Sequence, residues 1–376
     1  MLRVLSVFGT RPEAIKMAPL VKELAKYPQE IDSKVAVTAQ HREMLDQVLE
    51  LFQIIPDYDL DIMEQKQTLT QITTRALEGL GKVYQEAEPD LVLVHGDTTT
   101  TFVASLAAFY RQIKVGHVEA GLRTGNIYSP FPEEMNRRLT GVIADLHFAP
   151  TQTAKMNLLR EGIAEEKIYV TGNTVIDALL STVRSDFQTE QIPGLEGVNL
   201  EGRRVLLVTA HRRENLGEPM GRIFKALRHI VELFPDVQVV FPVHKNPLVR
   251  STVQEVLGDL PRVTLIEPLD YEPFVNLMAK AYIVLTDSGG LQEEAPSLGK
   301  PVLVLRDTTE RPEAVEAGTV SLVGTGYEEI FNETKRLLTD QAYYDKMANA
   351  VNPYGDGKAS QRIVRALREL HESQKL

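Results

Sequence analysis

Hydrophobic and polar positions alternate in blocks along the whole chain. Short runs of apolar and β-branched residues, typical of buried parallel strands, are separated by longer segments with the spacing of amphipathic helices. In the first half, the pattern predicts strands at residues 2–8, 34–38, 90–97, 114–121, 146–149 and 167–170. It predicts helices at residues 12–26, 43–52, 68–86 and 99–110.

The same pattern restarts after a loop-like stretch at residues 186–202. Strands are predicted at residues 204–209, 237–244, 263–266, 283–286 and 302–305, and helices at 219–234, 271–279 and 358–371. Strands that alternate with helices indicate parallel sheets covered by helices on both faces. The sequence therefore predicts two Rossmann-like, doubly wound α/β domains, which we expect to face each other across a cleft.

The segment 283-IVLTDSGGLQEEAPSLGKPVLVL-305 has the pattern of a strand, a glycine turn, a helix and a second strand. Backbone N–H groups of Gly289 and Gly290, next to a helix N-terminus, are suited to bind phosphate. Glu294, about one helical turn further on, is placed to accept hydrogen bonds from ribose hydroxyls. The alternative is that the glycines form only a turn and Glu294 only a helix cap, and the spacing by itself slightly favours that alternative.

Composition and charge exclude several classes of protein. The chain has 376 residues, a net charge of −11 and no cysteine. An acidic surface disfavours nucleic acid and anionic membranes as partners, and the lack of cysteine excludes disulfides, zinc–thiolate sites and cysteine nucleophiles. Without an apolar run of membrane-spanning length or a signal-peptide pattern, a cytoplasmic enzyme is expected.

Polar residues follow the predicted strands, at the strand ends where open α/β sheets bind their ligands. The candidates in the first half are Arg11, His41, Arg42, His95, Asp97, Glu119 and Arg123. Those in the second half are His211, Arg212, Arg213, Glu214, His244, Lys245 and Ser288. Such a concentration of charge at one rim favours a functional site over solvated surface.

These residue types point to diphosphate binding combined with acid–base chemistry. The cationic candidates for the diphosphate are Arg11, Lys16, His211 and Arg212. The carboxylates Asp97, Glu119 and Glu133 could divide the roles of acid and base, because clustering pushes their pKa values apart. The alternative is helix capping and salt bridging with Arg123, Arg137 and Arg138.

Other apparent motifs carry less weight. Residues 57–61 contain the D-x-D pattern of some metal-dependent glycosyltransferases, but they do not follow a buried strand and are interpreted as a polar loop. No G-x-G-x-x-G follows a strand, so a nicotinamide cofactor is not implied. Phe274 could stack on a nucleobase, although a core position is the simpler interpretation.

Longer motifs resemble a known family. The stretches are 8-FGTRPEAIKMAPL-20, 95-HGDTTTT-101, 117-HVEAGLRTG-125, 131-FPEEMNR-137, 171-TGNTVID-177, 209-TAHRRENLG-217, 285-LTDSGGLQEEAPSLGKPVLVLRDTTERPE-313 and 353-PYGDGKAS-360. Together they resemble the non-hydrolysing bacterial UDP-N-acetylglucosamine 2-epimerases almost from end to end.

The resemblance implies the GT-B architecture and a cytoplasmic homodimer. Its first domain would comprise residues 1–170 with the C-terminal helix 358–376 packed back on it, and its second, UDP-binding domain residues 171–357. The product would be UDP-N-acetylmannosamine for surface polysaccharide or teichoic-acid precursors. No metal or other cofactor is implied.

The resemblance also assigns roles to individual residues. The family's uridine and ribose site matches Phe274 and Glu294. Its diphosphate site matches Arg11, His211, Ser288, Gly289 and Gly290. The family's sugar-binding residues match Lys16, Asp97, Glu119, Glu133 and Arg137, and Arg311 matches a residue of the cleft. Asp97, Glu119, Glu133 and His211 are the expected catalytic residues. The resemblance reverses the simpler interpretations of Phe274 and of the glycine pair.

The implied reaction is elimination of UDP to 2-acetamidoglucal followed by re-addition. The family also implies a second UDP-N-acetylglucosamine that acts as an activator. The matching positions are Gln40, Gln67, Glu133, Arg212 and His244, with Glu43 and Lys66 adjacent. Two other classes remain open at this stage: a GT-B glycosyltransferase that uses a UDP-sugar, and a nucleotide-sugar sensor without catalysis.

Overall fold

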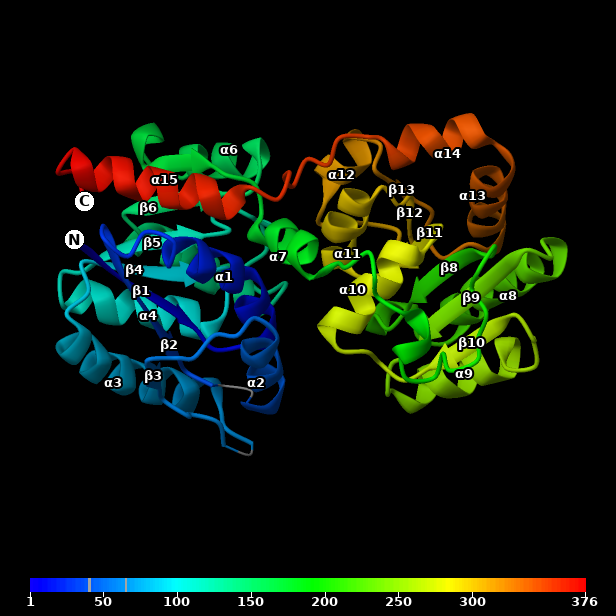
Figure 1. Cartoon of the computed structure of the whole chain (residues 1–376), viewed down its shortest axis with the longest axis horizontal. Helices are drawn as coiled ribbons and strands as arrows, with labels where there is room; N and C mark the ends of the chain where they lie inside the picture. Colours follow the sequence, from blue (N-terminus) through cyan, green and yellow to red (C-terminus); the bar gives the residue numbers. More distant parts are fainter. Residues whose placement is uncertain (40–41, 65) are drawn as a thin grey trace. The chain divides into compact units, whose positions relative to one another are not determined.

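The computed structural model describes residues 1–39, 42–64 and 66–376. They form two compact units, one of Met1–Ser181 with Tyr354–Leu376 and the other of Thr182–Pro353. Residues 171–181 and 354–357, which the sequence division placed with the second domain, therefore pack within unit 1. Both chain termini lie in unit 1 (Figure 1).

Unit 1 contains a seven-stranded sheet in the order β3-β2-β1-β4-β5-β6-β7. Every strand pairing in it is parallel. The strands are β1 (Leu2–Phe8), β2 (Ile31–Val37), β3 (Tyr58–Asp59), β4 (Leu91–His95), β5 (Lys114–Val118), β6 (Leu146–Ala149) and β7 (Ile168–Val170). The helices are α1 (Arg11–Leu24), α2 (Arg42–Leu51), α3 (Leu69–Ala87), α4 (Thr99–Tyr110), α5 (Glu133–Ile143), α6 (Gln152–Arg160), α7 (Thr174–Thr182) and α15 (Ala359–Glu372).

Unit 2 repeats this architecture with a six-stranded parallel sheet in the order β10-β9-β8-β11-β12-β13. Its strands are β8 (Arg204–Thr209), β9 (Val237–Pro242), β10 (Val263–Ile266), β11 (Ile283–Thr286), β12 (Val302–Val304) and β13 (Val320–Leu322). Its helices are α8 (Glu218–Leu233), α9 (Pro247–Leu257), α10 (Tyr271–Lys280), α11 (Gly289–Glu294), α12 (Pro312–Glu316), α13 (Tyr327–Thr339) and α14 (Gln341–Ala348).

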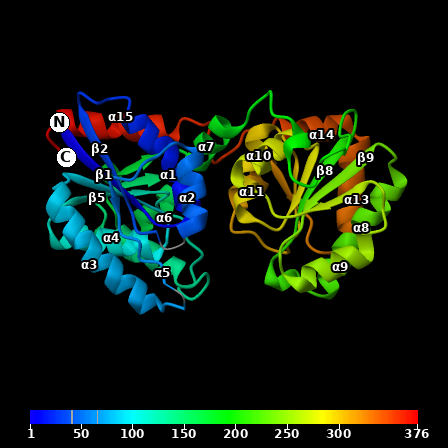
Figure 2. The ribbon, with the colours of Figure 1, turned by 60° about the horizontal axis from the view of Figure 1, so that its bottom comes forward.

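Helices cover both faces of each sheet, as Figure 1 and the rotated view in Figure 2 show. The strand order in both units reverses direction beside the first strand, at β1/β4 and at β8/β11. Such switch points open a crevice at the carboxyl ends of the strands, where doubly wound folds bind ligands. The predicted fold class of two parallel-sheet α/β domains is confirmed.

Burial explains why the apolar runs form strands. All five residues of β4 and all four residues of β11 are buried. A strand covered by helices on both faces exposes neither set of alternating side chains, so each position favours an apolar residue. This requirement gives the continuous hydrophobic runs that were visible in the sequence.

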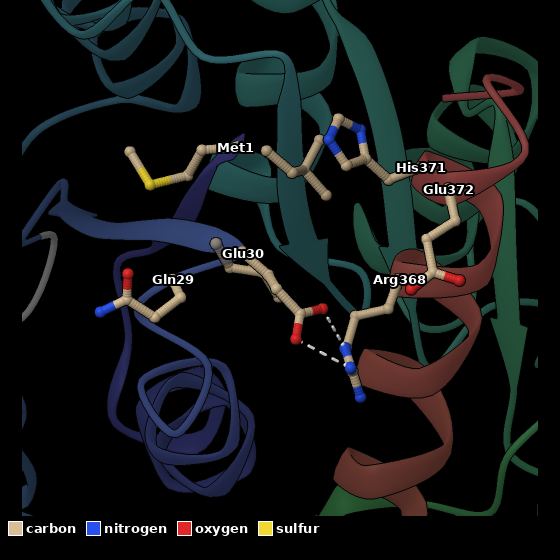
Figure 3. Close-up of a pocket in the computed structure, with 8 residues that line it drawn as sticks. Met1, Gln29, Glu30, Arg368, His371 and Glu372 are labelled. Carbon is tan, nitrogen blue, oxygen red and sulfur yellow. Dashed lines mark hydrogen bonds and ion pairs between the residues drawn. The ribbon is translucent and has the colours of Figure 1, made fainter.

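The C-terminal helix α15 packs against α1 in unit 1. Asp177 on α7 accepts hydrogen bonds from the backbone N–H groups of Ala359 (3.1 Å) and Ser360 (2.8 Å), which satisfies donors in the first turn of α15. Near the other end of the helix, Arg368 donates two hydrogen bonds to Glu30, at 2.6 and 2.9 Å (Figure 3).

A pocket of about 260 Å³ lies beside this ion pair. It is lined by Met1, Leu2, Gln29, Glu30, Ile31, Arg368, His371 and Glu372 (Figure 3). Because β1 and β2 begin at Leu2 and Ile31, the pocket is at the amino-terminal edge of the sheet. It is therefore separate from the strand ends that carry the predicted site.

Two local predictions need correction. Residues 57–61 were interpreted as a loop, but Tyr58 and Asp59 form the short edge strand β3 beside Ala36 and Val37. The glycine pair was expected in a turn, whereas α11 begins at Gly289 with Ser288 as its N-cap. Only Asp287 and Ser288 separate strand β11 from helix α11, and α11 is followed by a 3₁₀ turn at Ala295–Leu298.

Candidate active site

Three predicted residues meet at the carboxyl ends of the strands in unit 1. Asp97 follows β4, Glu119 follows β5, and Arg137 reaches both from α5. Arg137 Nη2 donates to Asp97 Oδ2 at 2.6 Å and to Glu119 Oε1 at 3.2 Å. Its Nη1 also donates to the backbone carbonyl of Glu119. The guanidinium group therefore holds the two carboxylates in a fixed relation to each other.

The second oxygen of Glu119 has its own partners. Glu119 Oε2 forms an ion pair with Lys16 Nζ and accepts a hydrogen bond from Asn173 Nδ2 at 2.8 Å. His95 Nε2 lies 3.7 Å from the same oxygen. Burial raises the pKa of Glu119, but the charges of Lys16 and Arg137 and the nearby His95 outweigh it and hold the pKa well below its usual value. The side chain is 6% exposed, so this carboxylate is charged yet nearly removed from water.

The backbone at this point is unusual. Glu119 has a φ angle of 59°, in the left-handed region that a residue with a long side chain seldom adopts. Gly96 has a φ angle of 71°, and a Cβ atom on it would lie 3.6 Å from Glu119 Oε1. Non-glycine residues with such backbones cluster at functional sites, where the surrounding contacts hold the strain.

Two further predicted residues of unit 1 begin helices. Glu133 is the first residue of α5, and its Oε2 atom is buried without a hydrogen-bond partner among the described residues. Such an oxygen can accept a hydrogen bond from a ligand or take up a proton. Arg11 is the first residue of α1 and is partly exposed after β1.

The alternative of structural salt bridges applies to Arg137 but not to the other two arginines. Arg123 pairs with Glu161 at 2.7 Å, and Arg138 pairs with Glu134 at 3.2 Å. Neither pairing involves the three candidate carboxylates. Arg137, predicted to bind substrate, is 5% exposed and is engaged with Asp97 and Glu119.

Sequence reasoning missed the buried carboxylate of Glu13. Its Oε2 accepts hydrogen bonds from the N–H groups of Gly9 (3.1 Å) and Thr10 (2.8 Å). Its Oε1 accepts from the hydroxyls of Thr98 (2.6 Å) and Thr101 (3.1 Å). Glu13 thus connects the loop before α1 to the start of α4. The T-x-x-E capping box at residues 10–13 was the available signal.

The cationic residues of unit 2 lie at the ends of β8 and β9. His211 and Arg212 follow β8, and their backbone N–H groups both donate to Asp287 Oδ2 at 2.8 Å. The imidazole ring of His211 stacks on that of His244, with centroids 5.4 Å apart. His211 and His244, predicted for different roles, are therefore neighbours.

The predicted nucleotide residues gather around α10 and α11. Gly289 and Gly290 form the first turn of α11, and Glu294 is its last residue. Tyr271 donates a hydrogen bond to Glu294 Oε1 at 3.1 Å, from the same helix α10 that carries the partly buried Phe274. Sequence reasoning also missed Tyr271, since no motif marks it.

Two further predicted residues have partners within their own units. Arg311 Nε donates to the buried carboxylate of Glu293. Gln67 accepts a hydrogen bond from Arg75 at 3.5 Å. Gln40 lies outside the described residues.

The fold and the residues at the strand ends define a class of protein. Each unit is a doubly wound α/β domain; one carries clustered carboxylates, and the other carries cationic side chains beside a helix that begins with two glycines. This combination is typical of GT-B-like enzymes that act on nucleotide sugars. Among the described stretches of chain, no helix is both long and apolar enough to cross a membrane.

Comparison with known proteins defines the family. The family model described as UDP-N-acetylglucosamine 2-epimerase matches residues 22–368. A UDP-N-acetylglucosamine 2-epimerase of Bacillus subtilis (strain 168) is 64% identical over 97% of this chain and 95% of its own length. That of Escherichia coli (strain K12) is 58% identical over 98% of both chains.

A solved structure gives the same result. The UDP-GlcNAc 2-epimerase from Neisseria meningitidis, solved bound to UDP-GlcNAc, has a TM-score of 0.87 and 55% identity, covering 98% of this chain and 100% of its own. The chain belongs to the UDP-N-acetylglucosamine 2-epimerase family. The resemblance noted in the sequence and the isomerase class that it implied are confirmed.

The buried histidine beside Glu119 predicts a pH dependence of stability. Burial lowers the pKa of His95 to about 4, against an ordinary value of about 6.5 in an unfolded chain. Between these values the unfolded chain binds more protons, so stability falls as the pH drops from about 6.5 to about 4. His95 alone should lower the free energy of unfolding by about 3 kcal/mol over this pH range.

The measurement is urea unfolding at several pH values for the wild type and for His95→Gln. The variant should lose less stability over this range, because it lacks the proton-binding group. His371→Gln, a change at a partly exposed histidine of the same unit, is the matched control. Equal pH slopes for the wild type and His95→Gln would contradict the prediction.

Proposed function

We propose that this protein interconverts UDP-N-acetylglucosamine and UDP-N-acetylmannosamine by inversion at C2 of the sugar. The observation that carries the proposal is the cluster of Asp97, Glu119 and Arg137 at the carboxyl ends of β4 and β5. It provides two carboxylates for proton transfer, of which Glu119 is nearly removed from water and Asp97 is one-third exposed. Family membership supplies the substrate class.

Elimination is the chemically reasonable path. The C2 proton has no adjacent ketone, so its removal would leave a carbanion without resonance stabilisation. When a base removes this proton while the C1–oxygen bond breaks, the C–H electron pair forms the C1–C2 double bond. UDP leaves with the electron pair of the broken bond, and the sugar becomes 2-acetamidoglucal.

Re-addition completes the inversion. The diphosphate oxygen attacks C1 again, and C2 takes a proton from the opposite face. Asp97, Glu119 and Glu133 are the groups that we assign to these proton transfers, because acid and base must act on the two faces of one ring. The steps involve proton transfer and a leaving anion, with no change of oxidation state between substrate and product.

The leaving diphosphate must be stabilised as its charge develops. Arg11, His211, Ser288 and the N–H groups of Gly289 and Gly290 are the proposed donors. Lys16 is engaged with Glu119, so we assign it to the sugar side. Glu294 would bind the ribose hydroxyls, Phe274 would stack on the uracil, and Arg311, placed against Glu293, would support this region.

The first test is an incubation with UDP-N-acetylglucosamine alone in D₂O, followed by NMR. Epimerised product should carry deuterium at C2, because the C2–H bond breaks and the new proton comes from exchangeable groups. Traces of free UDP and 2-acetamidoglucal should accompany it. Conversion only when a sugar acceptor is added would instead indicate a glycosyltransferase, and binding without conversion a sensor.

A second prediction concerns the carboxylates. Asp97→Asn, Glu119→Gln and Glu133→Gln keep the side-chain size but remove the proton-transfer group. General acid–base catalysis is typically worth about 10²–10⁴ in rate, so each variant should lose turnover on that scale. Glu166→Gln, at an exposed glutamate of the same unit, is the control and should keep wild-type turnover. Near-normal turnover in all three variants would make the carboxylates structural.

We also propose that the enzyme acts as a homodimer and that its product is used to make surface-polysaccharide or teichoic-acid precursors. A third proposal is that a second UDP-N-acetylglucosamine activates the enzyme. The activator residues carried over from the family are Gln40, Gln67, Glu133, Arg212 and His244. The stacking of His244 on His211 supports a link between the activator and catalytic positions. A ligand that favours one state of an enzyme does so through its differential affinity for that state.

Activation has a kinetic signature. The rate should rise sigmoidally with UDP-N-acetylglucosamine, and pure UDP-N-acetylmannosamine should react slowly until a trace of the other sugar nucleotide is added. Gln40→Ala and Gln67→Ala should weaken this activation, whereas Gln47→Ala, an exposed change on α2, should not. Hyperbolic kinetics with immediate reaction of pure UDP-N-acetylmannosamine would reject the activator site only.

A further inference from the structure

Asp287 is a buried carboxylate at the end of β11, immediately before Ser288. It is 0% exposed. Its Oδ2 accepts hydrogen bonds from the backbone N–H groups of His211 and Arg212, each at 2.8 Å, and from Asn215 Nδ2 at 3.1 Å. Asn215 also donates to the Leu305 carbonyl at 3.0 Å, which anchors this arrangement to the end of β12. The segment that follows β8 is therefore fastened to a single carboxylate oxygen.

The other oxygen of Asp287 faces the ring of His211. His211 Nδ1 lies 3.2 Å from Asp287 Oδ1, and the exposed fractions are 41% for the histidine side chain and 0% for the aspartate. Burial raises the pKa of Asp287, but the adjacent His211 ring and the backbone N–H groups of His211 and Arg212 outweigh it, so the pKa lies below its usual value. Oδ1 is buried and has no hydrogen-bond partner among the described residues, and His211 Nδ1, 3.2 Å away, is placed to supply one after a small rotation of the ring. A carboxylate without a proton can only accept, so Nδ1 would carry the proton in that bond.

The surroundings leave Asp287 as the group that orients this ring. The His244 ring stacks flat on the imidazole, with an interplanar angle of 17°, and so leaves the ring edge to Asp287. His244 Nδ1 itself accepts the N–H of Asn246 at 3.1 Å. The charge of Arg306 also acts on Asp287, but its guanidinium is paired with Glu214 and Glu310.

We propose that Asp287 is a positioning residue that fixes the ring and the tautomer of His211, with Nδ1–H bonded to Asp287 and Nε2 left for the ligand. The catalytic consequence rests on the proposed function, in which His211 contacts the departing diphosphate. A fixed ring places Nε2, with its proton when the ring is charged, at one point in space. When both ring nitrogens carry protons, the diphosphate meets an Nε2–H donor that needs no reorientation as the negative charge develops.

The test is Asp287→Asn, which preserves size and an acceptor oxygen. That oxygen can keep the two backbone N–H bonds, and the new NH₂ group then faces His211 Nδ1. Two donors cannot share this contact, so the neutral ring should move its proton from Nδ1 to Nε2. Long-range ¹H–¹⁵N NMR of ¹⁵N-histidine-labelled full-length protein at about pH 9, above the ordinary histidine pKa of about 6.5, reads the tautomer directly.

The wild type should show a protonated Nδ1 for His211, and Asp287→Asn an unprotonated one. The signal is assigned by its loss in His211→Gln. UDP affinity, measured by calorimetry, should fall in Asp287→Asn, and turnover should fall by up to about 10²–10³, the range for losing one preorganised donor to a developing negative charge. Asn215→Ala is the matched control: it removes another partner of the same carboxylate, and it should keep the wild-type tautomer.

The outcomes separate positioning from a structural role. An unprotonated Nδ1 in neutral wild-type protein overturns the proposal, and this result needs no variant to fold. An unchanged tautomer in folded Asp287→Asn, or the same tautomer change in Asn215→Ala, also overturns it. The tautomer is measured without substrate, so a wild type with the expected Nδ1–H that fails to epimerise would refute the proposed function and leave the positioning intact.

Discussion

The ionised carboxylate of Glu119, nearly removed from water, is the constraint on which the arrangement of unit 1 depends. A buried charge is costly unless opposite charges and hydrogen bonds compensate it, and removal of one partner from a buried pair typically costs about 3–5 kcal/mol. Lys16, Arg137 and Asn173 provide that compensation from α1, α5 and the segment after β7. The cluster therefore couples three distant parts of the chain to one carboxylate.

Buried carboxylates recur as anchors of the loops at the strand ends. Glu13 joins the loop after β1 to the loop after β4, and Asp287 joins the segment after β8 to the end of β11. In both units the anchored loops flank the topological switch point of the sheet. Four acceptor positions on one carboxylate can hold several N–H and O–H groups at once, so a single residue can rigidify a loop that must carry charged side chains.

Much of the fold could be predicted because burial on both faces of a parallel sheet demands continuous apolar runs. The predicted limits of the strands at residues 2–8 and 204–209 agree with β1 and β8. Helices α5, α6, α7, α12, α13 and α14 and strand β13 were not predicted. The pattern of α5 is weaker, because it contains buried Glu134, Asn136 and Arg137. Polar residues that are buried through tertiary contacts look like surface residues in a sequence.

The sequence by itself determined the alternation of strands and helices, the absence of cysteine chemistry and the residues that follow each strand. Those features depend on local spacing and residue type, which a linear pattern records. Only the tertiary structure decided which of these residues are partners: Arg137 and Lys16 face Glu119, Arg311 faces Glu293, and His211 faces Asp287. These pairs join residues 18 to 103 positions apart in the chain. Their geometry depends on how the strands and helices pack, and the charge each group can hold depends on the burial that this packing creates.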